Sequence, residues 1–207
     1  MENITQTTSV TKEELVREKL KAAFNYNTYR NDVSELASKG LSSGIQQSEA
    51  NADYTRLNDA RMRRLDKTIR VPEKIEERFR NFQGDQTWLV ITESWCGDAA
   101  QSIPAMNKLA TLSEDIDLKL IYRDSHPELM DAFLTNGARS IPKLIAIDNE
   151  SGNIINEWGP RPSAATVMAE NYKAEHGNLS ASFKQDLQVW YNKDKGLTTI
   201  QDLAELI

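Results

Sequence analysis

The first third of the chain carries apolar residues at helical spacing. After Thr11, apolar residues recur three or four positions apart, as on one face of a helix; they are Leu15, Val16, Leu20, Ala23 and Phe24. Thr11 and Glu14 stand at the spacing of a capping box. The stretch 38–50, with its glycines and serines, predicts a break before a second helix at 49–67, whose apolar positions are Tyr54, Leu57, Ala60, Met62 and Leu65. We therefore expect an N-terminal helical extension over residues 1–70.

From residue 71 onward, segments of helical spacing alternate with short apolar runs. The run 87–92 is almost entirely apolar and predicts a strand buried on both faces. Three more strands are predicted at 118–122, 143–147 and 154–158, and helices at 72–82, after residue 97, at 127–134 and at 163–176. This order predicts an α/β sandwich with a mixed central sheet over residues 71–176. Helices at 180–191 and 198–207 would form a C-terminal helical extension over residues 177–207.

The composition fits a folded protein with a polar, acidic surface. The chain has 207 residues, of which 39% are hydrophobic, and 25 Lys and Arg against 31 Asp and Glu give a net charge of -6. This charge makes nucleic acid and anionic membranes poor partners. No apolar run approaches the roughly 20 residues of a membrane span, and residues 1–10 lack the apolar region of a secretory signal. We expect a cytoplasmic location, with no membrane or nucleic-acid partner.

The single cysteine, Cys96, is the strongest candidate for a reactive residue. It follows the predicted strand 87–92 and opens a helix, where backbone N–H groups and the helix dipole stabilise a thiolate. The competing interpretation is that a lone cysteine acts as an inert small hydrophobic residue. His126 and His176 lie far from Cys96 and from each other in sequence, so no metal-ligand spacing exists and we expect no metal site.

Three sequence elements in register resemble the thioredoxin-like superfamily. Trp95-Cys96-Gly97 resembles the active-site turn of thioredoxins. The segment 136–142, ending in Ser140-Ile141-Pro142 before a strand, resembles the part that carries a cis-proline facing the active-site cysteine. Gly152-Asn153-Ile154, with Gly159 before the last helix, is similar to the final hairpin of that family. The resemblance implies that the Ile141–Pro142 bond is cis and that the backbone of Ile141 pairs with an extended substrate.

The sequence also resembles, more narrowly, a bacterial thioredoxin family with an N-terminal helical extension. The segments that carry this likeness are Trp95-Cys96-Gly97-Asp98-Ala99, Arg123-Asp124, Arg139-Ser140-Ile141-Pro142 and Trp158-Gly159-Pro160-Arg161-Pro162. That family also has an arginine-rich segment like the one at 61–68. Because Asp59 and Asp66 interleave with these arginines on a predicted helix, we expect an ion-paired surface or packing against the core domain there.

Two departures from the thioredoxin pattern change the expected chemistry. Ala99 stands where dithiol thioredoxins have their second cysteine, and Val90 stands where they keep a buried acid. A Cys96 thiolate can then form a mixed disulfide that only an external thiol, such as glutathione or another low-molecular-weight thiol, resolves. Asp98 has three open interpretations: a helix cap, a charge that raises the pKa of the thiol, or a proton-transfer group.

Two functions follow from these residues. The first is a monothiol thiol-disulfide oxidoreductase with Cys96 as nucleophile, surrounded by Trp95, Gly97, Asp98 and Ala99, with Arg139, Ile141 and Pro142 binding a protein or small-molecule disulfide. Arg139 would attract an acidic substrate, although a solvated charge is the simpler interpretation. The alternative is a non-catalytic module that binds peptides in the groove of Trp95 and Ile141-Pro142, with a further protein partner on the helical extensions.

Overall fold

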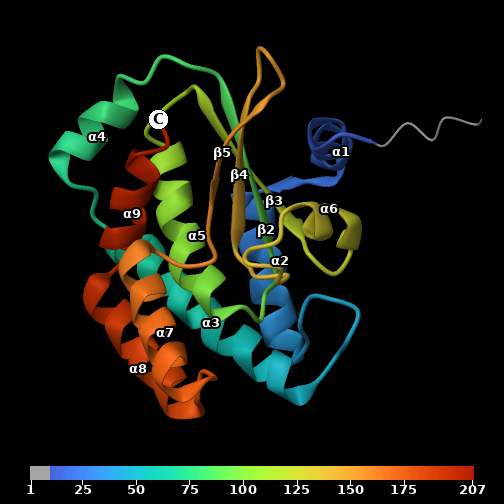
Figure 1. The fold of residues 1–207 in the computed structure, drawn as a ribbon, viewed down its shortest axis with the longest axis vertical. Helices are drawn as coiled ribbons and strands as arrows, with labels where there is room; N and C mark the ends of the chain where they lie inside the picture. Colours follow the sequence, from blue (N-terminus) through green and yellow to red (C-terminus); the bar gives the residue numbers. More distant parts are fainter. Residues whose placement is uncertain (1–9) are drawn as a thin grey trace, which may run out of the picture.

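The computed structural model describes residues 10–207 (Figure 1). The expectation drawn from residues 1–10 falls almost entirely on residues 1–9, which lie outside the described residues. Among residues 10–207, no helix combines the length and apolar character that crossing a bilayer requires.

A mixed five-stranded sheet forms the centre of the described chain, with strand order β1-β3-β2-β4-β5. The strands are β1 (Phe24–Asn25), β2 (Gln86–Thr92), β3 (Ile116–Tyr122), β4 (Lys143–Asp148) and β5 (Ile154–Trp158). The β2 and β3 strands pair in parallel, and the other neighbouring strands pair antiparallel. The α/β sandwich with a mixed central sheet that the sequence predicts is therefore confirmed.

Helices cover both faces of this sheet. They are α1 (Lys12–Lys19), the 3₁₀ helix η1 (Leu20–Ala22), α2 (Tyr26–Lys39), α3 (Glu49–Thr68), α4 (Glu73–Arg80), α5 (Gly97–Ala110), α6 (Pro127–Ala132), α7 (Ser163–His176), α8 (Ala181–Asp194) and α9 (Leu197–Ala204). Figure 1 shows α4, α5 and α9 on one side of the sheet and α1 and α6 on the other. The α7 and α8 helices lie side by side near the start of α5.

The core is built around β2, whose seven residues are all buried. Burial on both faces explains why this strand reads as a continuous apolar run rather than an alternating one. Trp88 is fully buried and packs edge-on against Phe79 of α4, with ring centroids 5.9 Å apart. The strand therefore forms a rigid base for the segment that follows it, which contains Cys96.

The helix predicted from Thr11 is shorter than expected. The Thr11 capping box is present, but α1 ends at Lys19, and Phe24 belongs to β1 rather than to a helical face. Phe24 pairs with Leu120 of β3, and Asn25 then caps α2 by accepting a hydrogen bond from the backbone N–H of Thr28 at 2.9 Å. A two-residue edge strand is too short to show a period of its own, so the sequence pattern did not reveal it.

The α3 helix lies where the pattern predicts a helix, but part of its predicted apolar face is wrong. Tyr54 and Leu57 are 46% and 50% exposed, whereas Met62 and Leu65 are buried. The remaining buried positions near the start of α3 are polar, and they include Thr55 and Asn58. These side chains hydrogen-bond to the segment before Cys96, which explains why they are buried in place of apolar residues.

Both terminal segments join the central sandwich. The β1 strand extends the sheet, and α3 packs along α5. At the other end, α9 packs on α4, α5 and α7, while α8 forms a small apolar cluster with α7 through Phe183, Leu187 and Tyr191. The division of the chain at residues 70/71 and 176/177 stays a prediction.

The position of α3 gives the first testable prediction. Leu65→Ala should lower the free energy of unfolding by about 2–5 kcal/mol, because Leu65 is buried in the core and its loss leaves a cavity. The matched control Leu57→Ala makes the same change on the exposed side of the same helix and should shift stability by no more than about 0.5 kcal/mol. Urea denaturation measures both, and similar losses for the two variants would contradict the packing of α3.

Candidate functional site

Cys96 occupies the N-cap position of α5, directly after the segment that follows β2. Its backbone N–H donates to the carbonyl of Glu93 at 3.2 Å, which closes a tight turn between strand and helix. The thiol donates a hydrogen bond to the carbonyl of Ile141, with Sγ and oxygen 3.2 Å apart. The structure thus brings Cys96 and Ile141, which lie 45 residues apart, into direct contact.

The Cys96 thiol is buried and protonated at neutral pH. Only 8% of the residue is exposed. Burial, followed by the negative charge of Asp98, raises the pKa of the thiol to about 12, and the backbone N–H groups of Ala99 and Asp98 oppose this rise only in part. A free cysteine has a pKa of about 8.5. The helix N-terminus therefore does not produce a thiolate in this state.

The segment that faces Cys96 contains a cis peptide bond between Ile141 and Pro142, and Gly159 packs closely against it. Gly159 has a φ of +119°, and a Cβ at this position would lie 2.2 Å from the carbonyl oxygen of Pro142. Only glycine allows this close approach. Gly159, which the sequence analysis grouped with the final hairpin, therefore lets the chain after β5 pack directly against the backbone of Pro142.

Asp98 links the start of α5 to the C-terminal part of the chain. Its carboxylate pairs with the guanidinium of Arg161 at 2.8 Å and accepts a hydrogen bond from the hydroxyl of Tyr191 at 3.0 Å. The side chain of Asp98 is 12% exposed, so burial raises its pKa while the charge of Arg161 lowers it. Burial and the charge of Asp98 also raise the pKa of Tyr191 well above its usual value. Of the three interpretations of Asp98, the structure supports the charge that raises the pKa of Cys96.

Side chains from α3 and α8 flank the first residue of α5. Nη1 of Arg61 and Nε2 of Gln188 would each lie 3.5 Å from a Cβ placed on Gly97. Arg61 donates to the amide oxygen of Asn58 at 2.8 Å, and Gln188 accepts a hydrogen bond from Gln101 at 3.0 Å. The helices at both ends of the chain thus reach the residue next to Cys96.

A buried polar cluster supports the turn before Cys96. Glu93 is fully buried, accepts hydrogen bonds from the hydroxyl of Ser43 and the backbone N–H of Asp124, and has a pKa raised by burial. Ser94 contacts the hydroxyl of Thr55 at 2.8 Å, and its carbonyl accepts from Asn58 at 2.8 Å. Val90 is buried within β2, as expected, while the nearby buried acid is Glu93, three residues further along the chain.

The other predicted site residues take different positions. Trp95 is partly exposed, and the guanidinium of Arg123 lies 4.9 Å from its ring centroid. Ala99 is fully buried one turn into α5. Arg139 lies on the surface, where its Nε and Nη2 donate to the two carboxylate oxygens of Asp131 at 2.6 and 2.5 Å. Arg139 is thus engaged by a neighbouring acid, which weakens its assignment to substrate binding.

Sequence reasoning missed four residues of this site: Arg61, Arg161, Gln188 and Tyr191. Arg161 stands beside Gly159 and Pro160 in a segment that carried the family resemblance, which was the only available signal. Arg61 and its neighbours were expected to form ion pairs, and Asp59 does pair with Arg63 and, at 3.2 Å, with Arg30. Nothing in the spacing along α8 indicates that Gln188 and Tyr191 point at α5.

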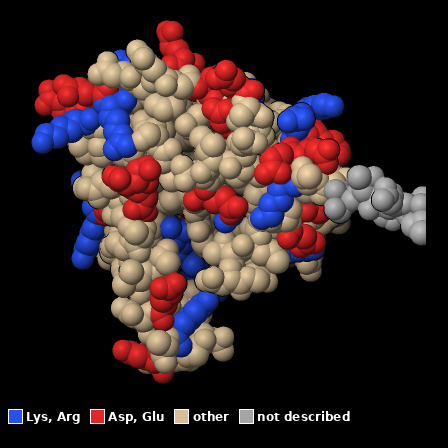
Figure 2. Space-filling model, turned by 45° about the horizontal axis from the view of Figure 1, so that its top comes forward, with Lys and Arg blue, Asp and Glu red and all other residues tan. Residues whose placement is uncertain are grey.

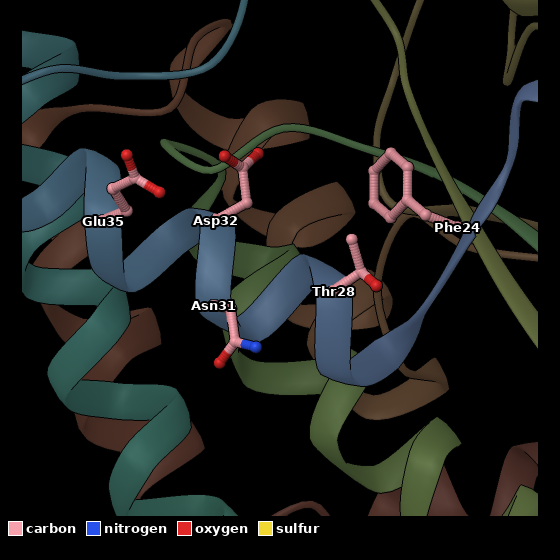
Figure 3. A pocket seen from close by; sticks show the side chains of 5 residues that line it. All are labelled: Phe24, Thr28, Asn31, Asp32 and Glu35. Atoms are coloured by element: carbon pink, nitrogen blue, oxygen red, sulfur yellow. The ribbon is translucent and has the colours of Figure 1, made fainter.

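The other surfaces have fewer features that could bind or react with a ligand. A hollow of about 310 Å³ lies between β1 and α2, lined by Phe24, Thr28, Asn31, Asp32 and Glu35 (Figure 3). Its two acids already have partners, since Tyr122 donates to Asp32 and Lys39 pairs with Glu35. In Figure 2 acidic and basic side chains are interspersed over the face shown. Within the described range 10–207, no three His, Cys, Asp or Glu side chains gather closely enough to hold a metal ion.

The effect of the Asp98 charge on the thiol gives the second prediction. Asp98→Asn removes the negative charge and leaves Arg161 unpaired, so the pKa of Cys96 should fall and alkylation by iodoacetamide at mildly alkaline pH should become about tenfold faster for each unit of that fall. Asp186→Asn, on the exposed face of α8, is the control and should leave the profile unchanged. If the alkylation rate at high pH rises but the midpoint of its pH dependence stays the same, the variant only exposes the thiol. That result would contradict an effect of the Asp98 charge on the pKa of Cys96.

Comparisons with known proteins agree with this geometry. A family model described as thioredoxin matches residues 44–173, more than half of the chain. A protein of unknown function from Pseudomonas aeruginosa has a similar structure, with a TM-score of 0.57 and 19% identity over 72% of this chain and 83% of that one. An HIV epitope scaffold gives a TM-score of 0.60 and 17% identity over 92% of this chain and 95% of its own. No curated protein sequence matches. The family match covers the β2–α5 turn, the Ile141–Pro142 segment and Gly159, and the chain therefore belongs to the thioredoxin family.

Proposed function

We propose that this protein exchanges disulfides by a monothiol mechanism in which Cys96 is the nucleophile. The observation that carries the proposal is the 3.2 Å contact between Sγ of Cys96 and the carbonyl of Ile141, just before the cis bond to Pro142. An extended substrate that pairs with the backbone of Ile141 would bring its disulfide to Sγ.

The exchange needs only atoms that the protein and its substrates supply. The Cys96 thiol loses its proton to water or to the leaving group, and the sulfur attacks one sulfur of the substrate disulfide. The substrate S–S bond breaks, and the departing thiolate carries away the electron pair, so Cys96 is oxidised to a mixed disulfide while one half of the substrate is reduced. Because Ala99 has no thiol, a second external thiol must attack the mixed disulfide and restore Cys96. A low-molecular-weight thiol in a reducing compartment such as the cytosol would serve as this resolving partner.

The raised pKa of Cys96 predicts that the resting protein reacts slowly. With a pKa of about 12, roughly one thiol in 10⁵ is ionised at pH 7, against a few per cent for a free cysteine. Because burial is the largest cause of the shift, exposing the sulfur to solvent or to a substrate would remove much of it. The proposed exchange therefore requires the side chains that cover the thiol to move aside.

The same burial favours a second candidate function, a binding module without turnover. A thiol with 8% exposure and a raised pKa behaves as a packed core residue. In that case Trp95 and the Ile141–Pro142 segment would bind an extended peptide, and Cys96 would only support the shape of the groove. The two candidates differ in one respect that can be measured, namely whether Cys96 forms a mixed disulfide.

The third prediction tests this difference. Incubation with oxidised glutathione at mildly alkaline pH should give a slow, stable one-to-one adduct at Cys96, because no second thiol in the chain can displace it. Mass spectrometry detects the adduct, and Cys96→Ser provides the blank. Absence of the adduct after prolonged incubation, while the urea-unfolded protein reacts, would contradict the exchange function and favour the binding module.

The fourth prediction restores the missing thiol. Ala99 lies one helical turn after Cys96, so a cysteine there should fall within the Cα separation of about 4.4–6.8 Å that a disulfide requires. Ala99→Cys should form a reversible internal disulfide and reduce a protein disulfide with turnover, while wild type and the control Ala99→Ser show little. If the variant folds but its thiols never pair under an oxidant, the assignment of Cys96 to a thioredoxin-type helix start is wrong.

A further inference from the structure

The α7 and α8 helices, which we call the α7–α8 hairpin (residues 163–194), have an apolar core of their own. Their buried apolar side chains cluster with one another and apart from the main core around β2; they are Ala165, Ala169, Phe183, Leu187 and Tyr191. Figure 1 shows the two helices extending side by side away from α9. Because these side chains are buried within the hairpin, the hairpin can move as a unit without exposing them.

The α8 side of the hairpin lies against the first turns of α5 and is held there by hydrogen bonds. The hydroxyl of Tyr191 donates to Asp98 at 3.0 Å, and the amide of Gln188 accepts from Gln101 at 3.0 Å. The same amide packs against Gly97, since Nε2 of Gln188 lies 3.5 Å from the position that a Cβ would take there. The helix thus packs on the residues directly after the cysteine.

A further polar contact holds α8 at a distance from the cysteine. Asn192 accepts a hydrogen bond from the guanidinium of Arg64 on α3 at 2.7 Å. Both residues are exposed, so water can replace either partner when the contact opens. Regions held by solvent-exposed polar contacts open at a lower free energy than a buried apolar core does.

Both ends of the hairpin are attached to α9. At the start of α7, the backbone N–H and the hydroxyl of Ser163 donate to the carboxylate of Asp202, each at 2.7 Å. Between α8 and α9, Lys195 and Gly196 have φ values of +54° and +83°, which break the helical backbone, and Gly196 is buried. Two attachments to one helix define an axis about which the hairpin can swing, with the loop at 177–180 as its free end.

We propose that the α7–α8 hairpin is a lid that controls access to Cys96. Swinging about α9 would separate Tyr191 and Gln188 from the start of α5 and open a path to the thiol. Exposure of the sulfur also removes burial, the largest cause of its raised pKa. The population of the open state then sets the rate at which Cys96 reacts. This inference describes the regulation of the proposed exchange and rests on it, although the opening itself can be measured without a disulfide.

The urea dependence of Cys96 alkylation in the whole chain gives the first test. The rate with iodoacetamide at a fixed, mildly alkaline pH should rise with urea well below the unfolding midpoint. Its slope should be a small fraction of the slope of global unfolding, measured by circular dichroism, because a swing of the hairpin exposes little surface.

A cross-link that fixes α8 on α3 gives the second test. Arg64→Cys combined with Asn192→Cys places two exposed thiols that a short bismaleimide can join at neutral pH, where the buried Cys96 stays protonated. Alkylation at Cys96, identified by peptide mass spectrometry, should then be slower by about tenfold or more. The control is the same double variant with each introduced thiol capped by N-ethylmaleimide.

A single substitution far from the thiol gives the third test. Asn192→Ala removes the contact with Arg64 and touches none of residues 96–98, so it should speed alkylation of Cys96 about threefold by weakening the closed state. Gln185→Ala is the control, because it also places alanine at an exposed polar position of α8, and it should leave the rate unchanged. Thermal unfolding monitored by circular dichroism verifies that each variant folds.

The outcomes separate the lid from the proposed function. An unchanged rate in the cross-linked protein would overturn the lid, because the thiol would then be reached without movement of α8. A urea slope equal to that of global unfolding would also overturn it. If alkylation follows the lid but oxidised glutathione gives no adduct, the lid stands and the exchange function falls. An adduct whose formation the cross-link does not slow would have the opposite meaning.

Discussion

The ion pair between Asp98 and Arg161, with the hydroxyl of Tyr191 as third member, connects the turn that carries Cys96 to the C-terminal part of the fold. It joins the first turn of α5 to the segment before α7 and to α8. The carboxylate that makes these contacts also lies close enough to Cys96 to raise the pKa of the thiol, in addition to the larger effect of burial. Asp98 therefore both attaches the C-terminal part of the chain to the site and adds to the burial that keeps the thiol protonated, while the charge of Arg161 opposes this effect.

The α3 helix, which lies within the family match, and the α8 helix, which lies beyond it, both take part in the site. The α3 helix supplies Thr55 and Asn58 to the turn before Cys96 and places Arg61 beside Gly97, and α8 supplies Gln188 and Tyr191. A thioredoxin-type thiol is usually reactive because it is exposed at a helix N-terminus. Here the same helix position is covered, and reactivity would depend on how readily the covering side chains separate.

The sequence predicted the sandwich well, because long apolar runs such as 87–92 and spaced helical positions reflect burial that the whole fold imposes. It failed for β1, whose two residues carry no period, and for the buried face of α3, where Thr55 and Asn58 replace the apolar Tyr54 and Leu57. Polar residues can be buried only where partners satisfy them, and those partners, around Ser94, lie about 40 residues away. Cys96, Ile141 and Pro142 could be found from a local motif, whereas Arg161, Gln188 and Tyr191 meet the site only through tertiary packing.

The central claim is that Cys96 is a thioredoxin-type thiol kept protonated by burial and by Asp98. Its most direct test is the pH dependence of the S–H stretching band of wild-type protein, followed by Raman spectroscopy, with Cys96→Ser as the blank. The account predicts that the band persists well above the free-cysteine pKa of about 8.5 and is lost only as the pH approaches about 12. Loss of the band at or below about pH 8.5 in the folded protein would contradict it.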